Sequence, residues 1–219
     1  VSITGTEYMY GPAVLCSLII VFILAIIVIR IPPLSWKKDV YRNGVVQTPE
    51  LARPGKYTMG IFKKALAAAT TKAKKTQYSV FITSIPDVLS FALKIVSIAT
   101  ISLFLCWYTP IFKWIGMPMI PYLQLCQMPD AAVIAPATLV GCAEIALPVM
   151  TIAGQQISEM AIFFVIVLST VQIIFFTESA NAMMKADMGL KFGQLIVIFL
   201  IRTVIAIPIV SVFAHIIYG

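Results

Sequence analysis

The sequence predicts an all-α integral membrane protein with about four transmembrane helices, one re-entrant helical hairpin and one amphipathic surface helix. Three observations predict this fold class. Hydrophobic residues make up 60% of the 219 residues and charged residues 11%, whereas soluble domains carry roughly 45–50% and 25%. The apolar residues form long uncharged runs, and most of the lysines and arginines lie in one stretch between two of these runs. A chain of this length has too small an interior to bury so much apolar surface, so much of it must face lipid.

The composition and the charge exclude several classes of protein. A soluble enzyme, a nucleic-acid-binding module, a disulfide-rich secreted domain and a disordered tail are all inconsistent with them. The formal net charge of +7 comes largely from ten lysines and arginines between Pro32 and Gln77, which are opposed there by Asp39 and Glu50. A basic loop between apolar spans is typical of the cytoplasmic side and of contact with anionic headgroups. We therefore expect membrane lipids, and no nucleic acid, as partners.

The first apolar run extends from Tyr8 to Ile29 without a charge and is long enough to cross a hydrocarbon core of about 30 Å. We assign residues 1–33 to this first transmembrane helix and residues 34–77 to a basic cytoplasmic loop. Within the loop, Met59 to Lys75 places apolar residues at helical spacing among lysines. This pattern predicts an amphipathic helix on the cytoplasmic surface, and a soluble linker helix is the alternative.

Residues 78–219 are assigned to a membrane domain that begins with a second span, from about Val88 to Tyr108. Pro86 and Asp87 suit the first turn of this helix. The N–H groups of a first turn have no partner within the helix, so proline, which lacks an N–H, is tolerated there, and an acid complements the helix dipole. Lys94 lies close enough to the cytoplasmic end of this span to extend to the headgroups, and we expect Thr109 and Pro110 to close the span on the outer side.

The region from Ile111 to Ser158 is interrupted by prolines and glycines, and we place a hairpin at about residues 120–156. Its two apolar halves, Ala131 to Ala143 and Ile145 to Ser158, flank Glu144. Neither half is long enough to cross a membrane alone, and apolar segments of about 10–14 residues are typical of re-entrant structure. Ordinary spans with kinked helices are the alternative.

A third span is predicted from Met160 to Thr177 and a fourth from Phe192 to about Ile217. The fourth span is interrupted by Arg202 and Pro208. The polar segment between these spans contains Lys185, so we place it on the cytoplasmic side.

Three ionisable side chains in or beside the apolar spans are the most informative about function, because a charge inside a bilayer costs about 2.5–3.5 kcal/mol on insertion scales. Arg202 lies near the middle of its span and requires a carboxylate, backbone carbonyls, water or an anionic ligand. Glu144 lies in the hairpin break, where unwound backbone can bind solute or ions, unless it is exposed at the outer interface. Glu178 ends the third span, either as part of a second break or as a solvated cap.

These patterns predict a substrate- or ion-binding site made of Gly141, Glu144, Pro148, Glu178, Ser179, Asn181 and Arg202. We prefer Glu178 to Glu144 as the ion-pair partner of Arg202, because a short loop makes the third and fourth spans antiparallel neighbours. Glu144 is then free for solute or for a coupling ion. Gln172 is a candidate for a hydrogen bond between helices.

The sequence contains no phosphate-binding loop, HExxH motif, catalytic triad or cysteine cluster. We therefore expect no enzyme activity, no metal site and no cofactor; a coupling ion, H⁺ or Na⁺, is the one small ligand expected besides the solute.

The second half of the chain contains several short motifs in a specific combination. They are Met128-Pro129-Asp130-Ala131-Ala132, Ala135-Pro136-Ala137, Gly141-Cys142-Ala143-Glu144, Leu147-Pro148, Glu178-Ser179, and Phe199-Leu200-Ile201-Arg202-Thr203 with Pro208. Together they resemble the YjiH-like branch of the nucleoside-recognition, or Gate, domain proteins. The resemblance covers roughly Met59 to Gly219 and is similar to the C-terminal half of the longer members. It implies a surface helix, a spanning helix, a re-entrant hairpin and further spans in each Gate unit.

We expect a subunit or half of a secondary transporter in the bacterial cytoplasmic (inner) membrane, for a small polar solute, anionic and nucleoside-like solutes included. The alternatives are a non-transporting scaffold or gating module for a partner membrane protein and, third, an intramembrane enzyme. With one hairpin, a transport pathway requires a second Gate-like half, a partner membrane chain or a homo-oligomer. The chain begins with Val1 and has no signal-peptide pattern, so we expect a fragment or one half of a longer polypeptide.

Overall fold

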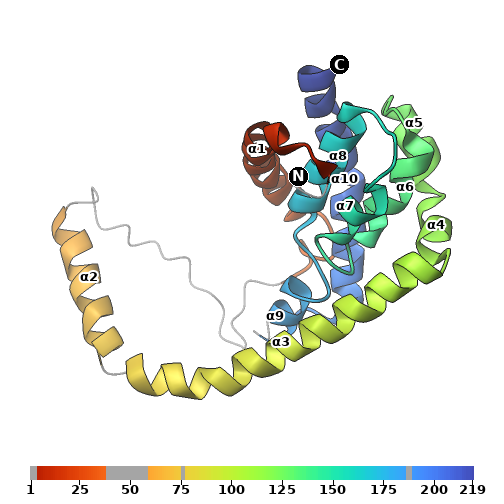
Figure 1. Ribbon diagram of the computed structural model, residues 1–219. Helices are drawn as coiled ribbons and strands as arrows, with labels where there is room; N and C mark the ends of the chain where they lie inside the picture. The colour runs from red at the N-terminus through yellow and green to blue at the C-terminus, as the bar shows by residue number, and fades with distance from the viewer. Residues whose placement is uncertain (1–3, 38–58, 75–76, 186–188) are drawn as a thin grey trace. The chain divides into compact units, whose positions relative to one another are not determined.

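The computed structural model describes residues 4–37, 59–74, 77–185 and 189–219, and the regular structure in these ranges is entirely helical (Figure 1). This confirms the predicted all-α class. The chain divides into two compact units, residues 38–94 and the remainder. Residues 38–58 of the predicted basic cytoplasmic loop lie outside the described residues.

The smaller unit contains helix α2, Met59–Lys74, and the first part of helix α3, Gln77–Tyr108. The predicted amphipathic helix is thus confirmed as a helix. The prediction that Pro86 and Asp87 form the first turn of the second helix is wrong, because α3 begins at Gln77 and Pro86 lies inside it. Residues 77–85 of α3 contain no glycine or other proline, and a proline within a long apolar helix is tolerated.

Three helical segments of the described chain are long and apolar enough to cross a membrane. They are Glu7–Val28, which combines a short 3-10 turn with α1 (Tyr10–Val28), then Ile82–Tyr108 within α3, and α10, Phe192–Tyr218. These segments correspond to the first, second and fourth predicted spans.

The third predicted span is shorter in the structure. Helix α8, Glu159–Gln172, has 14 residues, which is about 21 Å at 1.5 Å per residue and less than a core of about 30 Å. The described residues therefore hold three candidate spans in place of about four.

Helix α8 forms the centre of the larger unit, where it packs against α1 and α10 (Figure 1). Its side chains are buried on nearly every side, as Phe163, Phe164 and Leu168 illustrate. A helix that is apolar all round belongs in a core. In contrast, α1 and α10 expose large apolar side chains such as Phe22 and Val212, which suits lipid rather than water.

The predicted hairpin consists of helices α6, Ala131–Val140, and α7, Leu147–Ile152, which pack against each other and against α8. The two ends of the segment meet, because Asp130 Oδ2 accepts a hydrogen bond of 2.8 Å from the Ser158 N–H. Asp130 also has a left-handed backbone conformation, with φ of 55°, which reverses the chain just before α6. The segment therefore folds back to the point where it began.

Two further short helices, α4 (Ile111–Gly116) and α5 (Met119–Leu125), pack against α6. A Cβ atom at Gly116 would lie 2.7 Å from the backbone Cα of Pro136, so only glycine allows α4 to approach α6 this closely. Close backbone approach at small residues is a usual way for helices to pack in membranes. The Tyr122 hydroxyl donates 2.8 Å to the Val204 carbonyl, which ties α5 to α10.

Candidate functional site

Two breaks in helical structure meet in the larger unit. The first, residues 141–146, separates α6 from α7, and the second, residues 173–178, separates α8 from the short helix α9, Ser179–Lys185. The Phe176 N–H donates a hydrogen bond of 2.8 Å to the Cys142 carbonyl. The two breaks are therefore joined backbone to backbone, and we call the residues around this bond the polar junction.

Helix α8 ends at Gln172, five residues before the predicted end at Thr177. In a continuing helix the Val171 carbonyl would accept the N–H of residue 175. Here Arg202 Nε donates 2.8 Å to that carbonyl, and the Phe175 N–H instead donates 2.8 Å to Ser179 Oγ. Ile173 turns the chain with φ of 63°, a conformation that is costly for a β-branched residue. Side chains from α9 and α10 thus replace the next turn of the helix.

Gln172 joins three helices through its amide nitrogen. Nε2 donates 2.6 Å to the Thr138 carbonyl of α6 and 3.0 Å to Thr203 Oγ1 of α10. The Thr138 carbonyl is in the last turn of α6, where carbonyls lack partners within the helix. The prediction that Gln172 forms an inter-helix hydrogen bond is therefore confirmed. Gln172 completes α6 in the same way that Arg202 completes α8.

Four buried side-chain atoms at the polar junction have no hydrogen-bond partner among the described residues. They are Gln172 Oε1, Thr177 Oγ1, Asn181 Nδ2 and Arg202 Nη2. Gln172 and Thr177 have no exposed surface, and Arg202 is 8% exposed. Buried polar groups are almost always paired, so these atoms offer two donors, one acceptor and one hydroxyl to a further ligand.

Six of the seven predicted site residues are buried or half-buried, and Glu178 is exposed. Gly141, Pro148, Ser179, Asn181 and Arg202 lie in or directly beside the polar junction, buried or half-buried. Glu144 lies in the first break as predicted, is half-buried, and its Oε2 accepts 2.9 Å from the Ala146 N–H. Glu178 ends the second break but is exposed.

The predicted ion pair between Arg202 and Glu178 is wrong. Neither Glu178 nor another carboxylate of the described residues pairs with Arg202, whose Nε binds the Val171 carbonyl and whose Nη2 has no partner. The early end of α8 explains the difference: it turns a backbone carbonyl, and not the Glu178 carboxylate, toward α10. A buried cation at a helix C-terminus is also favoured by the helix dipole.

Sequence reasoning missed Thr138 and Thr203 as parts of the site. A threonine carbonyl inside an apolar run gives no signal in a sequence. Thr203 follows Arg202 directly, and a hydroxyl beside an intramembrane arginine is the signal that could have indicated it.

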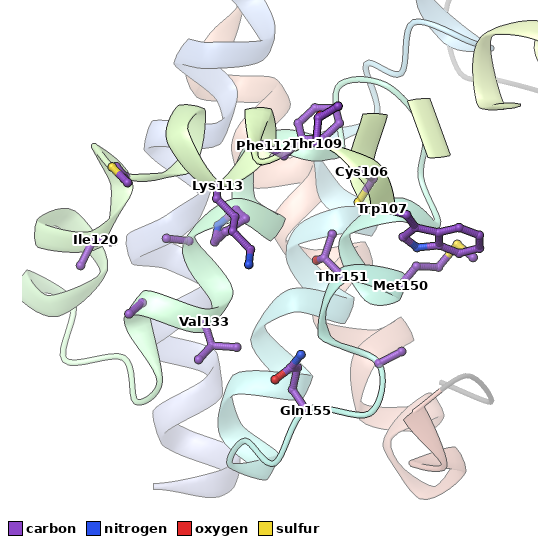
Figure 2. Close-up of a pocket in the computed structure, with 15 residues that line it drawn as sticks. Cys106, Trp107, Thr109, Phe112, Lys113, Ile120, Val133, Met150, Thr151 and Gln155 are labelled. Carbon is purple, nitrogen blue, oxygen red and sulfur yellow. The ribbon is translucent and has the colours of Figure 1, made fainter. Parts of the chain in front are cut away.

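Two cavities lie near the hairpin. A small apolar space of about 110 Å³ adjoins the polar junction at Cys142 and Phe176. A larger cavity of about 600 Å³ is lined by the end of α3, by α4, α5, α6 and α7, and by the segment after α7 (Figure 2). None of the predicted site residues lines the larger cavity.

Gly141 permits the close contact between the first break and Gln172, and we expect Gly141→Ala to destabilise the protein by about 1–3 kcal/mol, as overpacked cores do. The added Cβ would overlap Gln172 Oε1 and lie 3.2 Å from Pro148 Cγ. Gln172 cannot move aside without breaking both hydrogen bonds of its Nε2. Unfolding in an SDS titration measures the effect.

Gly193→Ala in α10 is the matched control, because a Cβ there meets nothing within 4 Å. It should be neutral or stabilising by up to about 1 kcal/mol from helix propensity. Equal unfolding midpoints for the two variants would contradict the close contact at Gly141.

Comparison with known proteins gives one relative. No family model matches the chain, and no solved structure matches it. A protein of Alkalihalophilus pseudofirmus that is described only as uncharacterized is 32% identical over 222 residues, which cover 100% of this chain and 48% of the relative. The chain thus spans about half the length of the curated relative it matches.

Proposed function

We propose that the protein is a subunit or half of a secondary transporter that moves a small polar solute, anionic and nucleoside-like solutes included, across the bacterial cytoplasmic membrane. The polar junction carries this proposal. Non-helical backbone at membrane depth is tolerated only where it is buried in protein or lines a water-filled space. Transporters place solute and ion sites at such interrupted helices, and here two interruptions meet beside unpaired polar atoms.

The unpaired atoms suggest the chemistry of the solute. Arg202 Nη2 and Asn181 Nδ2 are donors without acceptors, and they suit the oxygens of a carboxylate, phosphate or carbonyl group. Gln172 Oε1 and Thr177 Oγ1 can accept from a hydroxyl or an amine. Glu144 is the proposed ligand of a coupling ion, H⁺ or Na⁺, because it is the carboxylate in the first break.

A complete pathway under this proposal needs a second unit. Transporters with interrupted helices commonly place the site between two repeats. The relative has about as much chain outside the matched region as within it, which leaves room for a second Gate-like half. A partner membrane chain or a homo-oligomer would serve equally. Membership of the YjiH-like Gate proteins and a re-entrant position for α6 and α7 belong to the same proposal.

A non-transporting scaffold or gating module is the second candidate, and one observation favours it. Gln172 and Arg202 are nearly inaccessible, and both use donors to complete neighbouring helices. Such a network would hold a rigid structure together without any solute. In a transporter the unpaired atoms bind the solute, whereas in a scaffold they have no ligand. Solute uptake by variants of these residues distinguishes the two candidates.

The test is uptake of a panel of small metabolites into proteoliposomes that contain the protein, with and without H⁺ and Na⁺ gradients. We expect gradient-dependent uptake of at least one solute. Thr177→Val removes a hydroxyl that has no protein partner and should lower that uptake about tenfold, since a lost hydrogen bond to the solute costs about 1.4 kcal/mol. Its unfolding midpoint should equal or exceed that of the parent, because a buried unpaired group is removed.

Thr170→Val is the matched control, because the Thr170 hydroxyl donates 2.9 Å to the Ile166 carbonyl of its own helix. It should leave uptake unchanged. If no solute of the panel is transported while Thr177→Val stabilises the fold, the scaffold is the better interpretation.

A further inference from the structure

The larger cavity has the size of a ligand site and is separate from the polar junction. Its volume of about 600 Å³ falls within the range of about 300–1,000 Å³ that is usual for small-molecule pockets. Every residue that lines it belongs to the larger unit. It adjoins the halves of α6 and α7 that are remote from the first break.

The cavity contains one charge and several neutral polar groups. Lys113 is the one charged residue among the described residues that line it. Its amine extends into the cavity from α4, and the Gln155 amide enters from the segment after α7 (Figure 2). Thr109 and Thr151 donate their hydroxyl protons to the carbonyls of Leu105 and Pro148. Their oxygens are thereby left as acceptors for a ligand that carries hydroxyl groups.

The remaining walls are apolar. Val133 of α6 faces the cavity from one side, and Trp107 and Met150 face it from another (Figure 2). Pro136 of α6 also lines it. A ligand must therefore combine an anionic, hydroxyl-bearing part with an apolar part. An amphiphile has this combination, whereas a fully polar solute would leave these walls without partners.

The cavity lies at the end of a candidate span. Helix α3 ends at Tyr108, and Trp107, Tyr108 and Trp114 are 64%, 73% and 62% exposed there. Exposed tryptophan and tyrosine with a nearby lysine mark the headgroup level of a membrane. The charged part of a lipid would therefore lie at the depth of Lys113.

We propose that this cavity binds an anionic glycerophospholipid. The phosphate contacts the Lys113 amine, headgroup hydroxyls donate to Thr109 and Thr151, and an acyl chain lies along Val133 and Met150. This inference goes beyond transport and is independent of the polar junction. It predicts a retained lipid that holds α3 and α4 against the hairpin.

The experiment measures binding of phosphatidylglycerol and phosphatidylcholine to the full purified chain in detergent, by native mass spectrometry and thermal shift. Phosphatidylglycerol should bind one to one, at least tenfold more tightly than phosphatidylcholine. Lys113→Gln should weaken binding of phosphatidylglycerol about tenfold, because a charge-assisted hydrogen bond is lost. Val133→Trp retains the charge but fills the cavity, and it should weaken both lipids.

Lys191→Gln is the matched control, because Lys191 is exposed at the start of α10 and does not line the cavity; it should leave binding unchanged. Glycerol 3-phosphate, which carries the phosphate without an acyl chain, should not compete. Competition by glycerol 3-phosphate would assign the cavity to a water-soluble phosphate and overturn the lipid proposal. Equal binding of the two lipids, or binding unaffected by both Lys113→Gln and Val133→Trp, would also overturn it.

Discussion

Gln172→Leu should be the most destabilising single substitution in the polar junction, with a loss of about 3 kcal/mol in unfolding free energy. The variant removes both hydrogen bonds of Nε2 and leaves the Thr138 carbonyl and the Thr203 hydroxyl buried without their donor. An unpaired buried group costs about 1–3 kcal/mol. Inter-helix hydrogen bonds in membranes average only about 0.6 kcal/mol, so most of the loss comes from the stranded acceptors.

Gln124→Leu provides the control for this substitution. Gln124 is exposed on α5, so the same chemical change there should alter the unfolding free energy by no more than about 0.5 kcal/mol. The SDS titration used for Gly141→Ala compares the two variants directly. Equal midpoints would mean that Gln172 does not hold α6, α8 and α10 together.

The spans could be predicted from the sequence because they depend on local composition. Apolar runs of sufficient length placed α1 and α10 to within a few residues of their observed ends, although Arg202 interrupts the second of these runs. The two halves of the hairpin were also predictable, because Gly141 and Pro148 flank a charged residue between apolar segments that are too short to cross a membrane. Each of these signals lies within about twenty consecutive residues.

The end of α8 could not be predicted, because it depends on residues far away in the sequence. Residues 173–176 are as apolar as the helix before them, so hydrophobicity alone extends the span to Thr177. The helix ends because Arg202 and Ser179 take up the hydrogen-bonding groups that its next turn would use. The early start of α3 has the opposite cause, since Pro86 is a strong local signal that the surrounding helix overrides.

The polar junction was partly predictable, because some of its residues give a local signal and others depend on distant parts of the chain. Charged and breaking residues in apolar surroundings indicated Gly141, Glu144 and Arg202. The partners of the two charged residues are main-chain groups, however: Glu144 accepts from the Ala146 N–H, and Arg202 donates to the Val171 carbonyl. The sequence does not show which main-chain group a helix break will release. Pairing Arg202 with a carboxylate was therefore the natural expectation, and the structure replaces that carboxylate by the Val171 carbonyl.

Arg202→Met should lower solute uptake about a hundredfold while the unfolding free energy stays within about 1 kcal/mol of the parent. The lost bond from Nε to the Val171 carbonyl is a charge-assisted one, worth about 1.5–3 kcal/mol. The same change relieves the desolvation of a guanidinium that has no ion-pair partner among the described residues, which costs several kcal/mol. The two terms nearly cancel, so the arginine adds little net stability and its effect should appear in transport.

Arg202→Lys tests the geometry apart from the charge. Lysine has no donor at the position of Nε and no planar fork, so uptake should fall nearly as far as in Arg202→Met. A lysine variant that transports like the parent would show that the charge alone suffices.

Glu178→Gln distinguishes the observed contact of Arg202 with the Val171 carbonyl from the ion pair that the sequence suggested. Glu178 is exposed and does not pair with Arg202, so this variant should retain parental stability and uptake. A double-mutant cycle of Glu178→Gln with Arg202→Met should then be additive to within about 0.5 kcal/mol. A coupling above about 1 kcal/mol would restore the ion pair. Additive free energies combined with the loss of uptake in both Arg202 variants would leave the Nη2 nitrogen available to the solute, which is the role that the polar junction assigns to it.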